Sequence, residues 1–197
     1  MTFSTDDTER LDEARALLKA VEQCSNTERA DAMLGWAVEL LGPLADAGNP
    51  AAVWILSDAK SQFSDVKIDP DVAAEQHLAA LLAAANKGVP KAQFLASLHF
   101  FDNGDKRQSF ALCAQAAASG HAYAMWCHGL DLISGAGGPT DEQKGLKFIE
   151  RAATKKFEGA IRFMADALAI GQHGFTVDNA KAAKWHRMLS AQDVIRY

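Results

Sequence analysis

The chain has 197 residues, of which 49% are hydrophobic and 23% charged, which is the balance of a globular protein. Its net charge is −5 and no cluster of Lys and Arg could neutralise a run of phosphates, so we expect no nucleic-acid partner. The acidic start does not have the basic and apolar segments of a signal peptide, and no apolar stretch reaches membrane-spanning length, so we expect a cytoplasmic protein with no membrane span.

The chain is predicted to be helical from its start. Apolar residues recur at three- and four-residue steps and runs of β-branched residues are missing, which indicates an all-α protein. The first two predicted helices are Thr8–Cys24 and Thr27–Leu41, with cap residues available in Ser25–Thr27. We expect Gly42–Pro43 to kink or restart the second helix.

Four segments after this pair share an alanine three residues before a turn and a further alanine four residues after it, and in the last three segments the first alanine is doubled. The residues at the turn are Gly48, Gly88, Gly120 and Lys156. Their spacings of 40, 32 and 36 residues are those of helix pairs in a helical solenoid. Glycine can end a helix in the left-handed conformation without a side-chain clash, so the turn at Lys156 is expected to be the least regular.

The register of these segments extends beyond the turn. Nine residues after it stands a small residue: Ser57, Ser97, Gly129 or Ala165. Small residues at a fixed place let two helices approach closely. The first helices of the four pairs are predicted at about Pro50–Gln62, Pro90–Phe101, Ala122–Ile133 and Gly159–Gly171, and the second helices carry the double alanine.

The third and fourth segments also share an alanine, a glycine-containing loop, an Asp-x-x-Lys motif and an aromatic residue. These elements are Ala124, Gly135, Asp141, Lys144 and Phe148 in one segment, and Ala160, Gly171, Asp178, Lys181 and Trp185 in the other. With them the chain resembles, over roughly Leu34–Leu189, the SEL-one-like repeat family, which is related to the tetratricopeptide repeat. The resemblance implies a right-handed α–α superhelix of about four helix pairs plus an N-terminal pair, and a module that binds proteins without catalysis.

We therefore expect one helical-repeat domain over residues 1–197. It would consist of an N-terminal helix pair (8–43), a divergent unit (44–83), two further units (84–115 and 116–151) and a last unit with a C-terminal cap (152–197).

Two cysteines and two histidines within sixteen residues first suggest a metal or thiol–imidazole site: Cys113, His121, Cys127 and His128. In the repeat register, however, both cysteines occupy positions that are apolar in the other units, as free core cysteines do. His128 also stands at an apolar position, which favours a buried histidine bonded to a neighbouring carbonyl over a ligand. No third ligand follows at a fixed spacing, so we predict no metal, no cofactor and no catalytic residue.

The resemblance also points to a binding surface. By analogy with tetratricopeptide repeats, certain residues of each first helix would line the concave groove. The predicted partner-binding residues are Trp54, Lys91, Phe94, Leu98, Phe101, Tyr123, Trp126 and Arg162. The alternative is that the aromatic residues among them pack between neighbouring units.

The function expected from these features is that of a non-enzymatic adaptor that binds a protein or peptide. One alternative is an immunity protein or inhibitor that neutralises a toxin or effector, because an acidic surface could complement a basic partner. A self-associating scaffold is another. A metal- or thiol-dependent enzyme that uses Cys127 and His128 is the least favoured.

Overall fold

The computed structural model of the chain describes residues 5–63, 70–190 and 194–195. Over these ranges it contains ten α-helices and no strand, which confirms the predicted all-α helical-repeat class. None of the helices described combines the length and the apolar character that crossing a bilayer would require. The chain divides into two compact units, an N-terminal unit (residues 1–92) and a C-terminal unit (93–197), and each is described by itself.

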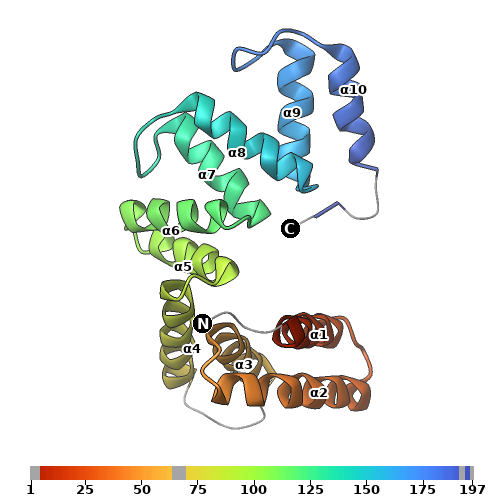
Figure 1. Cartoon of the computed structure of the whole chain (residues 1–197), viewed down its shortest axis with the longest axis vertical. Coiled ribbons are helices and arrows are strands. Elements are labelled where there is room, and N and C mark those ends of the chain that lie inside the picture. The colour runs from red at the N-terminus through yellow and green to blue at the C-terminus, as the bar shows by residue number, and fades with distance from the viewer. Residues whose placement is uncertain (1–4, 64–69, 191–193, 196–197) are drawn as a thin grey trace. The chain divides into compact units, whose positions relative to one another are not determined.

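The N-terminal unit contains four complete helices. They are α1 (Thr5–Glu22), α2 (Thr27–Asp46), α3 (Pro50–Phe63) and α4 (Pro70–Asn86). In this unit α1 packs against α2, α2 against α3, and α3 against α4 (Figure 1). Ala37 and Leu41 of α2 and Trp54 of α3 are buried between the helices.

The second helix is longer than predicted, because α2 continues through Pro43 to Asp46. The restart expected at Gly42–Pro43 is therefore wrong. Proline removes one backbone donor, but the bonds after it persist: the Ala47 N–H donates to the Pro43 carbonyl at 3.1 Å.

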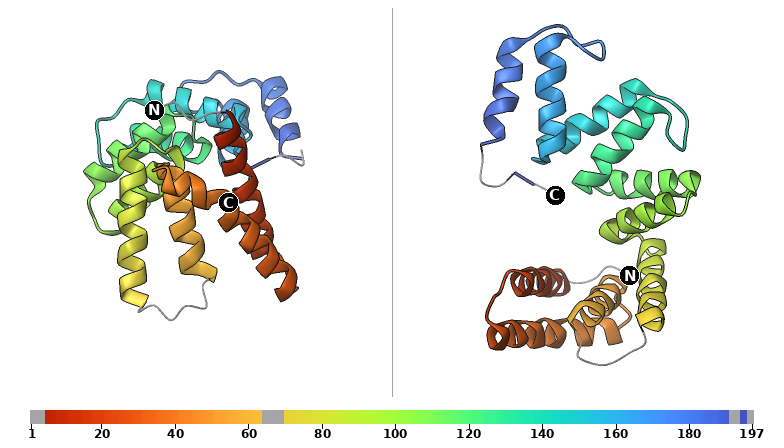
Figure 2. Two further views of the ribbon diagram at one scale, coloured as in Figure 1. Left: turned by 60° about the horizontal axis from the view of Figure 1, so that its bottom comes forward. Right: turned by 180° about the vertical axis from the view of Figure 1, so that it is seen from behind.

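The C-terminal unit contains the remaining helices, the first of which begins just before the unit boundary. They are α5 (Pro90–Asp102), α6 (Lys106–Ala118), α7 (Ala122–Ser134), α8 (Glu142–Thr154), α9 (Glu158–Ile170) and α10 (Asn179–Met188). In Figures 1 and 2, α7 and α8 lie side by side, as do α9 and α10. The four predicted first helices correspond to α3, α5, α7 and α9 to within one residue at each end.

All four repeat turns have the same geometry. The residue at the turn is left-handed in each, with φ of 79°, 86°, 94° and 65° at Gly48, Gly88, Gly120 and Lys156. The next amide donates to the carbonyl five residues earlier in each turn, as from Phe157 to Ala152 at 3.1 Å. This is the Schellman motif. The expectation that the Lys156 turn is the least regular is wrong, because the hydrogen bonds hold the lysine in the glycine conformation.

The second helix of each pair in the C-terminal unit begins after an aspartate. The Asp105, Asp141 and Asp178 carboxylates precede α6, α8 and α10, and each accepts a hydrogen bond from the amide three residues later at 2.9–3.0 Å. These are N-caps. The Asp-x-x-Lys motif of the sequence is therefore a capping motif, which positions the helix after each glycine-containing loop.

Two glycines let α7 and α8 cross closely. A Cβ at Gly129 would lie 2.6 Å from Ile149 Cγ1, and one at Gly145 would lie 2.6 Å from the Gly129 carbonyl oxygen. Real Cβ atoms do not approach so closely, so both positions require glycine. The role predicted for the small residue nine after the turn is confirmed at Gly129.

Candidate partner-binding face

The N-terminal unit contains two of the predicted partner-binding residues, Trp54 and Lys91. Trp54 is only 2% exposed. The Lys91 ammonium lies 5.8 Å from the centroid of the Trp54 ring, within range of a cation–π contact. The indole is thus used in packing and offers little surface to a partner.

Three more of the predicted residues lie on α5 and differ in exposure. Phe94 is 4% exposed and belongs to the core of the C-terminal unit. Leu98 and Phe101 are exposed, and Phe101 keeps 55% of its surface open to solvent. Phe94 therefore supports the fold, whereas Leu98 and Phe101 are accessible to a partner.

Tyr123 and Trp126 of α7 are half-buried and meet around a buried phenylalanine. The Tyr123 ring stacks on Phe157 with the centroids 5.1 Å apart, and Trp126 lies 6.0 Å from the same ring. Phe163 lies edge-on to Trp126 at 5.8 Å. These separations are those of favourable aromatic pairs. We call Tyr123, Trp126, Phe157 and Phe163 the aromatic face.

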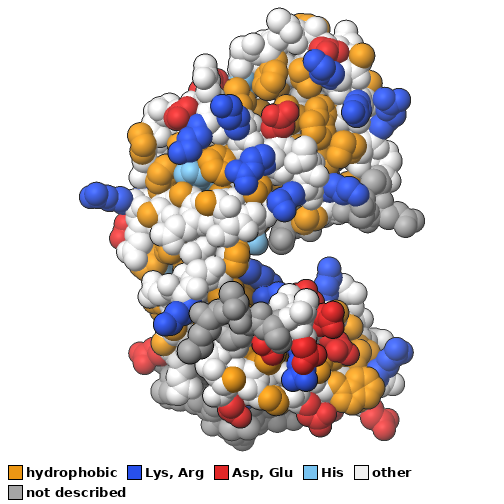
Figure 3. Space-filling model, in the orientation of Figure 1, with side chains coloured by type: hydrophobic (Ala, Val, Ile, Leu, Met, Phe, Trp, Pro, Cys, Tyr) orange, Lys and Arg blue, Asp and Glu red, His pale blue; other side chains and the backbone are white. Residues whose placement is uncertain are grey.

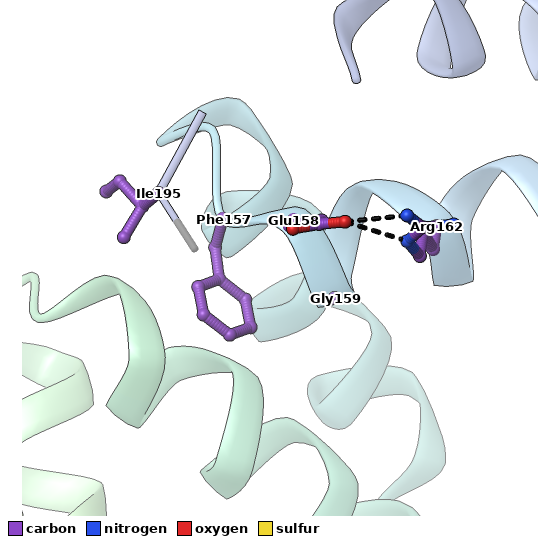
Figure 4. A pocket seen from close by; sticks show the side chains of 5 residues that line it. All are labelled: Phe157, Glu158, Gly159, Arg162 and Ile195. Carbon is purple, nitrogen blue, oxygen red and sulfur yellow. Dashed lines mark hydrogen bonds and ion pairs between the residues drawn. The ribbon is translucent and has the colours of Figure 1, made fainter. Parts of the chain in front are cut away.

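Arg162, the last predicted residue, lies beside a hollow at the start of α9. Both Nε and Nη2 of Arg162 donate to Glu158 Oε1, at 3.1 and 2.6 Å (Figure 4). The hollow has a volume of about 220 Å³ and is lined by Phe157, Glu158, Gly159, Arg162 and Ile195. A Cβ at Gly159 would lie 3.0 Å from Phe157 Cε1, so the glycine leaves room for the aromatic face. The structure thus places Arg162 near Phe157, which contacts both Tyr123 and Trp126.

Comparison of the repeat units did not identify Phe157 and Phe163 as site residues. Phe157 follows the turn, where the other units have Asn49, Val89 and His121, so no shared residue type marks the position. Phe157 is the N-cap of α9 and makes no side-chain capping bond, so no capping residue type marks it either. The one available signal was its spacing from Arg162, which places both residues near the start of the same helix.

The Cys/His cluster is divided between capping and core packing. His121 is the N-cap of α7, where Nδ1 accepts from the Ala124 amide at 3.2 Å. His128 is buried between Phe110 and Phe148, with ring centroids 4.9 and 5.0 Å away. Within the described part of the chain, His128 Nδ1 has no hydrogen-bond partner. The predicted bond between this histidine and a carbonyl is therefore not made at Nδ1, because aromatic rings surround it.

Burial sets the protonation states in this cluster. It lowers the pKa of His128 to about 4, with Lys144 acting in the same direction, and raises the pKa of Cys127 to about 12. It also raises the pKa of the Cys113 thiol, and it raises the pKa of Asp131 to about 6. At neutral pH the thiols are protonated and His128 is neutral, so this cluster provides no thiolate nucleophile. Among the described residues, no three His, Cys, Asp or Glu side chains are grouped so as to hold a metal ion.

Charge is distributed unevenly between the two units. The N-terminal unit has 15 Asp and Glu against 8 Lys and Arg, and the C-terminal unit has 10 against 12, which together give the net charge of −5. In Figure 3, Asp and Glu side chains gather on the N-terminal unit, while Lys and Arg lie among hydrophobic side chains on the C-terminal unit. The two units therefore present surfaces of different chemistry.

The acidic unit also exposes a large aromatic side chain that the sequence analysis missed. Trp36 on α2 is 58% exposed. It lies outside the buried stripe that contains Ala37, Leu41 and Leu44 of the same helix. A tryptophan next to, but not on, an apolar stripe was the signal available in the sequence.

Repeated helix pairs with a common turn and no strand within the described ranges define an α-helical repeat protein. The sequence matches no protein-family model and no curated protein. Solved structures do share the fold. One is a protective antigen of uropathogenic Escherichia coli strains that displays a SEL-one-like repeat fold, at TM-score 0.62 and 19% identity over 93% of this chain. The chain spans 38% of the length of that antigen.

A second similar structure is a SEL-one repeat protein from Oxalobacter formigenes, at TM-score 0.54 and 26% identity, over 64% of this chain and 95% of that one. The chain thus has the SEL-one-like repeat fold, in agreement with the resemblance predicted from the sequence. An immunity protein from Pseudomonas aeruginosa has a similar fold as well, at TM-score 0.50 and 16% identity, over 96% of this chain and 83% of that one.

Proposed function

We propose that the protein is a non-catalytic interaction module that binds a protein partner through the aromatic face of its C-terminal unit. The observation that carries this proposal is the pair of half-exposed rings, Tyr123 and Trp126, held by Phe157 beside an open hollow with a charged rim. Rings fixed in this way lose little conformational entropy on binding. Tyr, Trp and Arg are also the residues most enriched at binding hot spots.

The remaining predictions belong to the same proposal. A cytoplasmic location and the lack of a cofactor are part of the proposal, and the protonated thiols and the neutral His128 support the part that assigns no catalytic role to the Cys/His cluster. The exposed Leu98 and Phe101 would extend the contact along α5. Trp54 and Phe94 would support the surface from within, since both are buried.

The test is the affinity for a partner isolated from the native cell by pull-down with the full chain. We expect the Tyr123→Ala and Trp126→Ala variants each to bind about tenfold or more weakly, with helical content unchanged by circular dichroism. Ile170→Ala is the matched control, because Ile170 is an exposed hydrophobic residue of α9 outside the aromatic face. Unchanged affinity in folded Tyr123 and Trp126 variants would refute the proposal.

A second candidate function is that of an immunity protein that neutralises a basic toxin. The excess of Asp and Glu in the N-terminal unit favours it, together with the exposed Trp36 on α2. Opposite charge would steer the toxin, and burial of the indole would then retain it. The similar fold of the Pseudomonas aeruginosa immunity protein gives this candidate a precedent.

This second function is tested with the purified product of any toxin-like reading frame adjacent to the gene. Trp36→Ala should increase the rate at which the toxin dissociates. A triple variant, Glu28→Lys, Asp31→Lys and Glu39→Lys, should slow its association. If both variants still neutralised the toxin fully, the N-terminal unit would be excluded as the inhibitory surface. Tyr123→Ala and Trp126→Ala serve as the comparison, since a toxin bound at α2 should not respond to them.

A further inference from the structure

The described C-terminal segment, Val194–Ile195, pairs with the turn between α8 and α9. The Ile195 N–H donates to the Lys156 carbonyl at 2.8 Å, and the Glu158 N–H donates to the Ile195 carbonyl at 3.1 Å. Phe157 and Ile195 thereby form a parallel β-bridge. The turn binds an extended segment through its main chain, as a sheet edge does.

Main-chain pairing at this turn depends on the residue two positions after it. That position is Pro50 and Pro90 in the first two units, where proline has no N–H, and Glu158 here. Glu158 is the first residue of α9, so its N–H is not needed within the helix. Phe157 before it is extended, with φ −73° and ψ 120°, so that the Lys156 carbonyl on one side of it and the Glu158 N–H on the other both face the neighbouring segment.

The side chains around the turn favour aliphatic residues. Val194 is 7% exposed and belongs to the core of the C-terminal unit, and Ile195 packs against the same core. The hollow next to Ile195 remains open between Phe157 and the Glu158–Arg162 ion pair (Figure 4). Phe157 also stacks on Tyr123, so a segment bound at the turn lies against a ring of the aromatic face.

We propose that this turn and hollow form a strand-binding site, at which the protein partner places an extended segment with consecutive aliphatic side chains in exchange for Val194–Ile195. The inference rests on the proposed function, since it specifies how a partner of the aromatic face is held. The way in which the chain's own segment is bound defines what the site offers a partner: the Lys156 carbonyl as acceptor, the Glu158 N–H as donor, and an apolar surface beside them. As an intramolecular ligand at high effective concentration this segment also competes with the partner.

The experiment uses the full chain and a fluorescein-labelled peptide, Asp-Val-Ile-Arg-Tyr, with the sequence of residues 193–197. Ile195→Pro in the protein removes the internal donor and should open the site. We expect the peptide to bind this variant about five- to tenfold more tightly than the wild type, as measured by fluorescence anisotropy. The same peptide with Ile195→Pro should bind more weakly, because it does not have the N–H that Lys156 accepts.

The matched pair of variants is Glu158→Pro and Glu158→Ala, each made in the Ile195→Pro protein. Both remove the ion pair with Arg162, but only proline removes the N–H, and it does so at a first helical position where proline is tolerated. Peptide binding should be lost with proline and kept with alanine. The inference is overturned if the peptide binds the Glu158→Pro and Glu158→Ala proteins equally well, or if it does not bind the Ile195→Pro protein at all.

Val194→Ser is a second variant that should free the site if the Ile195→Pro protein does not fold. It removes a buried apolar side chain and keeps the Ile195 N–H and carbonyl. The outcome is separable from that of the proposed function. If the peptide fails to bind while Tyr123→Ala and Trp126→Ala still weaken the native partner, the strand-binding mode is wrong and the aromatic face stands.

Discussion

Lys156 has a left-handed backbone, with φ 65°, at a position where the other three units have glycine. A side chain in this conformation costs about 1 kcal/mol, so Lys156→Gly should raise the free energy of unfolding by about 0.5–1 kcal/mol. Gly88→Ala at the equivalent turn, where φ is 86°, should lower it by about 1 kcal/mol. Urea denaturation followed by circular dichroism measures both, and a loss of stability in Lys156→Gly would contradict the assignment of strain.

His128 makes stability depend on pH. Its pKa is about 4 in the folded protein and 6.5 ordinarily, so below pH 6.5 the unfolded chain gains a proton that the folded protein does not bind. The stabilisation is complete above pH 6.5 and is lost as the pH falls towards 4. His128→Leu, which places there the residue found at Leu56, should lose less stability between pH 7 and pH 4.

Asp131 acts in the opposite direction and provides the control for this titration. Its pKa is raised to about 6 from 3.8, so ionisation destabilises the fold as the pH rises through this range. Asp131→Asn should therefore be more stable than the wild type at pH 7, with the difference shrinking towards pH 4. Parallel pH profiles for the His128 and Asp131 variants would show that burial does not set these pKa values.

At the scale of the helices, the crossing of α7 and α8 leaves no room for an added methyl group. Gly129→Ala would place a methyl group 2.6 Å from Ile149 Cγ1 and 2.9 Å from the Gly145 carbonyl, which should destabilise the protein by about 1–3 kcal/mol. Gly35→Ala in α2 is the matched control, because nothing lies within 4 Å of the added Cβ. It should stabilise the protein by about 0.5–1 kcal/mol. Thermal unfolding of the two variants tests this contrast.

The helices were predictable because local signals agreed. Glycine turns, Asp-x-x-Lys motifs and alanine spacing each mark a helix end, and the observed ends of α3, α5, α7 and α9 follow them. The errors arose where a hydrogen-bond pattern overrode a residue preference. Pro43 lies within α2, and Lys156 adopts the glycine conformation, because neighbouring backbone bonds hold both.

The candidate site was less predictable because register does not specify exposure. Trp54, Phe94 and Trp126 share one register position, yet the first two are buried and the third is half-exposed. The difference arises from the neighbouring helices, which sequence spacing does not describe. The pairing of Ile195 with the turn at Phe157 joins residues 38 positions apart, and no local motif marks it.

For the whole molecule, the unequal charge of the two units separates the two candidate functions by their response to salt. A basic partner of the N-terminal unit should associate about tenfold or more slowly when ionic strength rises from about 0.05 M to 0.5 M. A partner held by the aromatic face, through apolar and main-chain contacts, should change much less. Stopped-flow association rates measured across this range would distinguish the two surfaces, and a flat profile for an α2-dependent partner would argue against electrostatic steering.

The placement of the tryptophans allows each unit to be followed by its intrinsic fluorescence. The N-terminal unit has Trp36 and Trp54, and the C-terminal unit has Trp126 and Trp185. Because Trp36 is exposed and Trp54 is buried, acrylamide should quench the first emission and spare the second. Replacing one tryptophan at a time by phenylalanine would thus assign the emission of each unit without an added label. Binding at the aromatic face and binding at α2 could then be followed separately.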